Sequence, residues 1–133
     1  MRTIKFRGKY KSDWKYGNLV STETKGRIHY YIVDGESKLL VNPDTVGQFT
    51  GLYDAFNNEI YEGDILQVSG TDIVKIIEYR QPVASFCLAN VEDIDIRYTD
   101  PWQRPDTMWY RDFKLIKLGN KFDNENLLKK ENV

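Results

Sequence analysis

The chain is poor in the residues on which disulfides, zinc sites and nucleophilic catalysis depend. Among its 133 residues, Cys87 is the single cysteine and His29 the single histidine. One cysteine cannot form an intramolecular disulfide or a structural zinc site made of thiolates. Cys87 lies in an apolar run, which predicts a buried and unreactive thiol, and nothing in the local sequence brings His29 to it as a base.

Long apolar segments and an excess of one charge are also missing. No apolar run approaches the roughly 20 residues of a membrane span. The first residues, Met-Arg-Thr-Ile-Lys-Phe-Arg-Gly, lack the apolar stretch of a signal peptide. The formal net charge is −1, so there is no global attraction to nucleic acid or to anionic membranes. We therefore expect a cytoplasmic protein that does not contact a membrane.

Aromatic residues, in contrast, are abundant, and they fall in patterns typical of β-strands. They make up 14% of the chain, and aromatic and β-branched residues favour strands. Apolar and polar residues alternate in short runs that are separated by turn residues such as Lys25-Gly26, Asp34-Gly35 and Ser69-Gly70. These patterns predict the following strands: residues 3–7, 14–20, 27–33, 38–41, 45–53, 65–68, 73–79, 83–89, 94–98 and 108–118. The segment Asn42-Pro-Asp44 is predicted to be a turn.

The predicted fold is mainly β, with small antiparallel barrel-like sheets and a short C-terminal helix over residues 125–130. The strands between residues 65 and 89 resemble the meander of an SH3-type barrel. The length suggests one domain, 1–133. Two β subdomains, 1–58 and 59–133, remain an alternative, and the second of them would be SH3-like.

A cluster of four carboxylates lies in the middle of the chain, formed by Asp54, Glu59, Glu62 and Asp64. Such a group could hold a divalent cation, but its spacing matches no EF-hand loop. The favoured interpretation is turn chemistry, in which Asp54 and Glu59 bracket a hairpin and Asp64 accepts hydrogen bonds from backbone N–H groups. No metal site is predicted here.

A second acidic run, Glu92, Asp93 and Asp95, precedes a proline-containing loop with Trp102 and a following Trp109. Two carboxylates on one strand face could act as acid and base, beside rings that stack on a sugar or a base. A solvated strand face with core tryptophans is the favoured interpretation, because no further catalytic partner is visible.

Basic and aromatic residues interleave near the N-terminus in Lys5-Phe-Arg-Gly-Lys-Tyr-Lys11. Such a surface could bind single-stranded nucleic acid, although any strand with one core face shows the same alternation. The glycines at 47 and 51 fit neither a Walker loop nor a dinucleotide fingerprint, so no cofactor is predicted. His29 is expected at the surface, provided that Ile28, Tyr30 and Ile32 face the core.

Three stretches together resemble one known family. They are Ile4-Lys-Phe-Arg-Gly8 followed by Trp14 and Tyr16-Gly17; the central block from Asn42 to Ile65, including Asp44-Thr-Val-Gly-Gln-Phe-Thr-Gly-Leu52 and Asn58-Glu-Ile-Tyr-Glu-Gly-Asp-Ile65; and Gly119-Asn-Lys-Phe-Asp-Asn-Glu-Asn-Leu-Leu128. They are similar to the pattern of the YopX family of phage and prophage proteins. The tail departs from that pattern, since Glu125 stands where proline is usual.

The resemblance implies a phage-encoded protein of the host cytoplasm that forms homo-oligomers, and it carries over no catalytic residue. In the central block, Val46, Phe49, Leu52, Ile60, Tyr61 and Ile65 are predicted to fill a core. We therefore expect a non-catalytic accessory protein that binds an unknown phage or host macromolecule. The candidate partner surface is formed by Trp102, Met108 and Trp109. The alternative is a nucleic-acid-binding β-barrel, and an enzyme using either acidic cluster with a metal is the third hypothesis.

Overall fold

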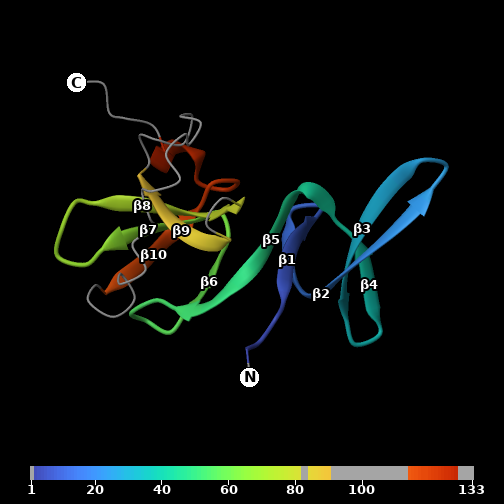
Figure 1. The fold of residues 1–133 in the computed structure, drawn as a ribbon, viewed down its shortest axis with the longest axis horizontal. Helices are drawn as coiled ribbons and strands as arrows, with labels where there is room; N and C mark the ends of the chain where they lie inside the picture. Colours follow the sequence, from blue (N-terminus) through green and yellow to red (C-terminus); the bar gives the residue numbers. More distant parts are fainter. Residues whose placement is uncertain (1, 82–83, 91–113, 129–133) are drawn as a thin grey trace. The chain divides into compact units, whose positions relative to one another are not determined.

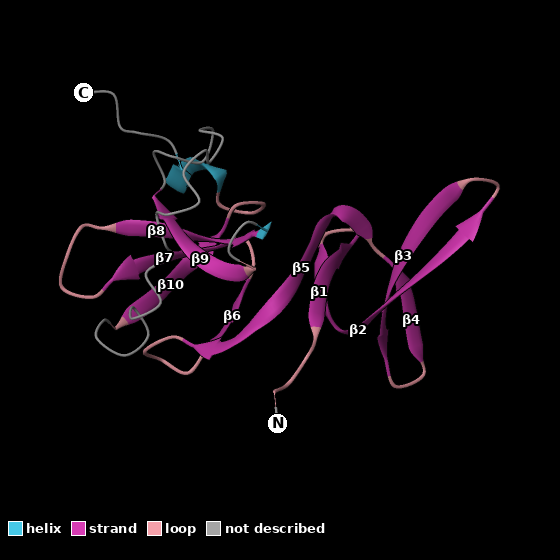
Figure 2. Cartoon of the chain, in the orientation of Figure 1, coloured by secondary structure: helices cyan, strands magenta, loops and turns pink. Residues whose placement is uncertain are grey.

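The part of the chain that the structure describes is mainly β-strand and forms two antiparallel sheets (Figures 1 and 2). The computed structural model describes residues 2–81, 84–90 and 114–128. The prediction of a mainly-β fold is confirmed. The chain divides into two compact units, Met1–Gly51 and Leu52–Val133. This division falls inside a strand, whereas the sequence placed its alternative boundary between residues 58 and 59.

The first unit is a sheet in which neighbouring strands are antiparallel (Figure 1). Its order is β4-β3-β2-β1-β5, and β5 continues into the second unit, where β6 follows in the sheet order. The strands are β1 (Phe6–Tyr10), β2 (Asp13–Thr24), β3 (Arg27–Asp34), β4 (Ser37–Leu40) and β5 (Asn42–Tyr53). Lys25 and Gly26, with φ of 53° and 77°, form the tight turn that the sequence predicted between β2 and β3.

Strand β2 serves two partners in succession. Its residues 13–17 pair with β1, and its residues 18–24 pair with β3. Gly17 lies at the change of partner, where a Cβ would run into the carbonyl oxygen of Val33. A side chain at this position would push β3 away, so glycine is required by a close backbone approach.

The predicted turn at Asn42-Pro-Asp44 was wrong, because β5 begins at Asn42. The register between β1 and β5 jumps from Arg7–Gly47 to Lys9–Asn42, so β5 has several extra residues here and its ladder with β1 is irregular. Turn-type hydrogen bonds persist inside this irregular segment, where Asp44 N donates to Asn42 Oδ1 over 3.0 Å. Thr45 Oγ1 then accepts from Lys9 N over 2.8 Å. Pairing with β1 thus extends the strand through a segment that has local turn chemistry.

The second unit contains a four-stranded sheet with the order β10-β7-β8-β9. Its strands are β7 (Asp64–Val68), β8 (Val74–Arg80), β9 (Ser85–Asn90) and β10 (Leu115–Asn120), and it is preceded by β6 (Glu59–Tyr61). The predicted meander is confirmed, since β7, β8 and β9 pair consecutively and antiparallel. The predicted C-terminal helix is present as a 3-10 helix, η3 (Glu125–Leu128), and its predicted residues 129 and 130 lie outside the described residues.

The hydrophobic core of the second unit is centred on Ile60, Leu66, Ile77 and Leu115, each at most 3% exposed. Leu52, Val68, Phe86 and Leu88 pack around this cluster. The central block contributes as predicted: Phe49, Ile60, Tyr61 and Ile65 are buried, while Val46 and Leu52 are half-buried. Across the described ranges, no helix is long and apolar enough to cross a membrane.

Candidate functional site

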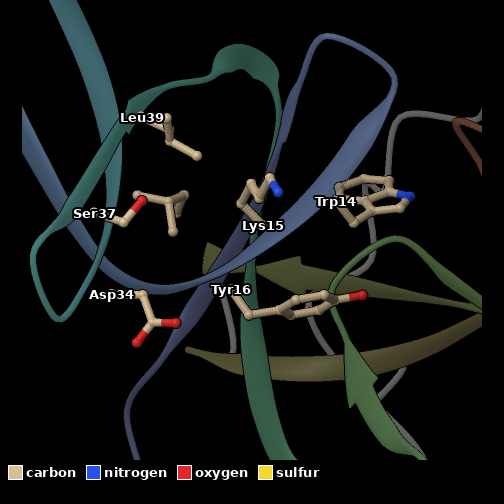
Figure 3. Close-up of a pocket in the computed structure, with 7 residues that line it drawn as sticks. Trp14, Lys15, Tyr16, Asp34, Ser37 and Leu39 are labelled. Carbon is tan, nitrogen blue, oxygen red and sulfur yellow. The ribbon is translucent and has the colours of Figure 1, made fainter.

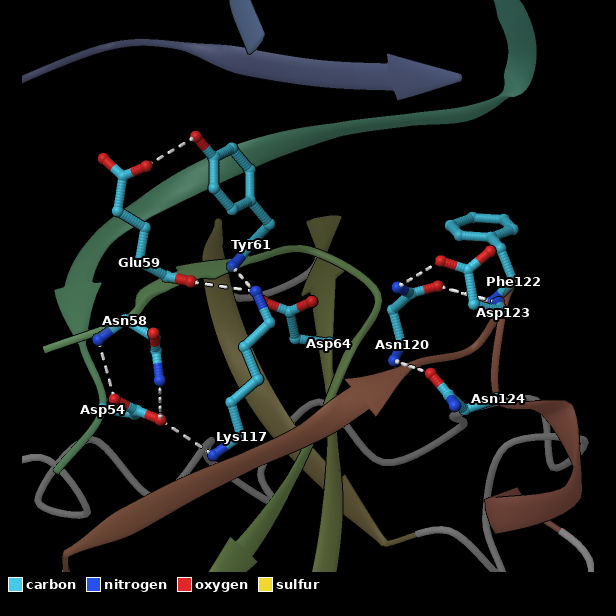
Figure 4. A network of polar contacts seen from close by, with 10 residues as sticks. All are labelled: Asp54, Asn58, Glu59, Tyr61, Asp64, Lys117, Asn120, Phe122, Asp123 and Asn124. Atoms are coloured by element: carbon cyan, nitrogen blue, oxygen red, sulfur yellow. Dashed lines mark hydrogen bonds and ion pairs between the residues drawn. The ribbon is translucent and has the colours of Figure 1, made fainter. Parts of the chain in front are cut away.

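Asp54 of the central block closes a hairpin and holds a distant strand (Figure 4). Its Oδ1 accepts hydrogen bonds from the backbone N–H groups of Phe56 and Asn58, at 2.9 and 2.8 Å. Its Oδ2 accepts from Asn58 Nδ2 at 3.1 Å and from the backbone N–H of Lys117 at 3.0 Å. The turn role predicted for Asp54 is confirmed. Asn57 at the tip has φ of 69°, which asparagine tolerates better than most residues.

The electrostatics of Asp54 follow from these donors. Burial raises the pKa of the carboxyl group, but the hydrogen bonds from Lys117, Asn58 and Phe56 outweigh it and hold the pKa below its usual value. The carboxylate therefore stays ionised while it is largely removed from water.

Asp64 is fully buried and forms an ion pair with Lys117. Its Oδ2 accepts from Tyr61 N at 2.6 Å and lies 3.1 Å from Lys117 Nζ. The same Nζ donates to the carbonyl oxygen of Glu59 at 3.1 Å. Figure 4 shows that Lys117 contacts two aspartates: its backbone N–H points to Asp54, and its side chain extends to Asp64. We call Asp54, Asp64 and Lys117 the acid–lysine junction.

Two carboxylates of the acidic cluster, Asp54 and Asp64, thus belong to the acid–lysine junction. Glu59 Oε1 accepts from the Tyr61 hydroxyl at 3.2 Å, and Glu62 is half-buried. In the part of the chain that the structure describes, no group of three or more His, Cys, Asp or Glu side chains is placed to hold a metal ion. The sequence did not reveal Lys117 as the partner of both aspartates, because the ladder between β7 and β10 brings it there.

The tail motif, residues 119–128, forms a second network of polar contacts in the second unit. Asn120 Oδ1 accepts from Phe122 N and Asp123 N, at 3.0 and 2.9 Å. Asn124 Oδ1 accepts from Asn120 N at 3.1 Å. A Cβ on Gly119 would collide with the Asn124 side chain. The motif that the sequence singled out therefore shapes the chain reversal after β10 (Figure 4).

The basic residues near the N-terminus lie against aromatic rings within the first unit. Arg7 Cζ lies 4.5 Å and Lys9 Nζ 5.3 Å from the centre of the Trp14 ring. Lys5 Nζ lies 5.6 Å from the centre of the Phe49 ring. Arg7 is only 1% exposed. Part of the positive charge that suggested nucleic-acid binding is therefore used in cation–π packing.

A pocket of about 270 Å³ opens in the first unit (Figure 3). It is lined by Trp14, Lys15, Tyr16, Ile32, Asp34, Ser37 and Leu39. Figure 3 shows the Trp14 and Tyr16 rings, both from β2, projecting to the same side. A mixed lining of one cation, one anion and four bulky apolar or aromatic side chains defines no single ligand chemistry.

Strands β2, β3 and β4 form a three-stranded ribbon. The pocket residues Ile32 and Leu39 lie on one of its faces, and the other face carries a row of apolar side chains. Val20, Tyr31 and Leu40 stand directly opposite one another across the three strands, so their side chains share one face. Val20 is 38% and Leu40 49% exposed. We call this side the Tyr31 face; its side chains are Asn18, Val20, Thr22, Thr24, Arg27, His29, Tyr31, Val33, Lys38 and Leu40.

The only histidine of the chain, His29, lies in the first unit, and the only cysteine, Cys87, lies in the second. His29 is half-buried on the Tyr31 face, while Ile28 on the reverse face is 56% exposed, so the expectation that Ile28 faces a core was wrong. Only Ile32 of that reverse set is buried, because the ribbon has water on both sides. Cys87 is buried as predicted, and burial raises the pKa of its thiol.

The predicted partner surface, Trp102, Met108 and Trp109, lies outside the described residues. The same holds for the carboxylates Glu92, Asp93 and Asp95. These expectations stay predictions.

The charge of the sequence is divided between the two units. Residues 1–51 contain nine Lys and Arg against five Asp and Glu, a net charge of +4. Residues 52–133 contain ten against fifteen, a net charge of −5. The overall value of −1 thus hides a basic and an acidic half.

The structure defines a mainly-β protein with two antiparallel sheets, in which the central acids Asp54 and Asp64 have structural partners. Residues 5–129 match the family model of the YopX protein, so the chain belongs to the YopX family. Among solved structures it is similar to the crystal structure of protein EF1440 from Enterococcus faecalis. The two share 19% identity over 97% of this chain and 100% of that chain, with a TM-score of 0.49. No curated protein gives a significant match.

Proposed function

We propose that this YopX-family protein is a non-catalytic accessory protein that self-associates and binds a macromolecular partner. The phage and prophage setting of the family supports an origin in such a genome and a site of action in the cytoplasm of a bacterial host. The observation that carries the proposal is the Tyr31 face.

A three-stranded ribbon with water on both faces buries little apolar area for the strands it orders. On the Tyr31 face, Val20 and Leu40 remain more than a third exposed beside a half-buried Tyr31. Contiguous exposed apolar side chains that are rimmed by polar ones mark interaction sites. The face has this composition, since threonine, asparagine and basic side chains surround its apolar row.

The geometry of the central acids supports a role without catalysis. Both oxygens of Asp54 accept hydrogen bonds from N–H groups, and Oδ2 of Asp64 contacts Tyr61 N and Lys117 Nζ. A general base must instead reach a proton on a substrate. These two acids hold strands together, which accounts for their presence without a reaction.

Size-exclusion chromatography with light scattering tests the self-association half of the proposal. We expect a mass above the 15.6 kDa of one chain at high protein concentration. A monomer at every concentration would remove that half. For the partner half, the tagged protein is used as bait in induced host cells, with Trp102→Ala/Trp109→Ala as the comparison. Loss of a captured species in that variant would support the predicted tryptophan surface, while unchanged capture would contradict it.

Nucleic-acid binding is the second candidate, and the basic first unit favours it. The net charge of +4 on residues 1–51 is a local attraction that the overall charge conceals. Labelled single-stranded DNA and RNA are the probes, titrated at rising salt. Binding that weakens steeply with salt would support this candidate, and no binding at low salt would end it.

A further inference from the structure

The Tyr31 face is electrostatically one-sided. Among its ten side chains are two cations, Arg27 and Lys38, and no carboxylate. The reverse face of the same ribbon carries Glu23 and Asp34. Both cations are exposed, and Lys38 Nζ lies 4.6 Å from the centre of the Tyr31 ring. The face therefore presents an apolar row with a polar rim whose charged side chains are all positive.

This charge pattern restricts how two copies can meet. In a symmetric pair, the same patch would lie on both sides of the contact. Such a pair would bring together two faces whose only charged side chains are the cations Arg27 and Lys38, and like charges at an interface are unfavourable. The charge pattern therefore favours a partner copy that presents a different, acidic surface.

The second unit of the same chain has the complementary charge. Residues 52–133 carry a net charge of −5. Among their described side chains the carboxylates Asp72, Asp123 and Glu125 are exposed, together with two cations, Lys114 and Lys121. The same unit also exposes apolar side chains, since Phe56 is 71%, Ile73 49% and Leu118 39% exposed. An interface needs both an apolar centre and charge complementarity, and this unit offers both kinds of group.

We propose that the Tyr31 face of one copy docks on the acidic second unit of another copy, in a head-to-tail contact. The inference rests on the self-association proposed above and specifies its surfaces. Because the two surfaces differ, the contact is heterologous, and repetition builds a ring or an open chain. Strand β4 is an edge strand of its sheet. Within the described residues, the Tyr31 face therefore reaches the sheet edge, and no further strand pairs there.

Salt dependence is the first test, read by sedimentation velocity of the full chain at about 50 and about 500 mM NaCl, where the screening length differs severalfold. Opposite charges across the contact predict that association weakens as salt rises. A symmetric contact between two Tyr31 faces would strengthen under the same change, because salt screens its repulsion. Association that strengthens with salt or is unaffected by it would overturn the inference.

Charge reversal is the second test, with the variant Arg27→Glu/Lys38→Glu. We expect its self-association to be weaker than that of the wild type by at least about tenfold in Kd. The control Arg2→Glu/Lys11→Glu makes the same change in net charge at exposed positions of the first unit off the face, and it should associate more tightly than the first variant. Equal weakening in both variants would show a general charge effect and overturn the proposed surface.

The apolar row has its own matched pair. Leu40→Ala removes an exposed aliphatic side chain from the Tyr31 face, whereas Ile28→Ala removes one of similar exposure from the reverse face. We expect a several-fold weakening for Leu40→Ala and no change for Ile28→Ala. If Ile28→Ala has the larger effect, the contact uses the other face. Circular dichroism confirms that each variant is folded.

Crosslinking identifies the surfaces directly and separates the two proposals. A carbodiimide joins lysine to carboxylate in an equal mixture of ¹⁴N and ¹⁵N protein, and mixed-isotope products report contacts between copies. Links from Lys38 to carboxylates of residues 52–133 are expected in those products. If the wild type is monomeric, the proposed self-association fails as well. If it associates while Lys38 crosslinks only within one copy, the head-to-tail contact alone fails.

Discussion

At the residue scale, the Asp54 carboxylate ties a five-residue turn to a strand that is 63 positions away in sequence. Replacing it with asparagine keeps one acceptor oxygen but places an NH₂ group opposite the N–H of Lys117 and the amide of Asn58. We expect Asp54→Asn to lower the free energy of unfolding by about 2 kcal/mol, since a buried donor loses its acceptor. Urea unfolding measures this loss.

The matched control is Asp44→Asn, at an exposed position of β5. Its effect should stay within about 0.5 kcal/mol, as is usual for surface substitutions. If Asp44→Asn destabilised the protein as much as Asp54→Asn, the effect would reflect net charge, and the assigned hydrogen bonds would not explain it.

The pKa of Asp54 leads to a pH prediction at the same scale. The folded pKa is held below the unfolded one, which is about 3.9. The stabilisation by the carboxylate is therefore complete above that value and is lost as the pH falls through the lower folded pKa. The difference in unfolding free energy between wild type and Asp54→Asn should be constant from about pH 5 to about pH 7 and shrink below about pH 4. A difference that grows towards acid pH would contradict this assignment.

At the scale of elements, strand β10 is held by one lysine whose charge is matched by a fully buried aspartate. Lys117→Met removes the cation from Asp64 and should cost about 3 kcal/mol of unfolding free energy, because a buried charge loses its counterion. Asp64→Asn/Lys117→Met should cost less than the sum of the single substitutions. Thermal or urea unfolding of the four proteins in this double-mutant cycle gives the coupling energy.

Lys114→Met is the control for that cycle, because Lys114 is exposed just before β10. It should leave stability nearly unchanged. Additive single effects at Asp64 and Lys117 would mean that the ion pair does not hold the strand.

The elements also show which features local sequence could reveal. Alternation and turn residues predicted β3, β7 and β8 to within about a residue or two, since their pattern and their tertiary role agree. The strand through Asn42-Pro-Asp44 was missed because pairing with β1 overrides local turn chemistry. The role of Asp54 in its turn was predictable, because the acceptor and most of its donors lie within four residues. Lys117 was not, because a sheet ladder determines its position.

At the scale of the whole molecule, burial is uneven between the two units, and this predicts uneven opening. Ile65, Leu66, Ile76 and Ile77 of β7 and β8 are at most 1% exposed, whereas the β3–β4 ribbon has water on both faces. Hydrogen exchange slows where opening breaks apolar packing. Peptides covering residues 64–80 should therefore exchange much more slowly than peptides covering 27–40 in dilute solution.

The proposed docking adds a second expectation, because a copy that covers the Tyr31 face should slow exchange in 27–40 as protein concentration rises. Exchange measured by mass spectrometry at two concentrations checks both, with Arg27→Glu/Lys38→Glu as the variant in which the concentration effect should vanish. Slow exchange of 27–40 at every concentration would mean that the ribbon is stabilised within a single chain.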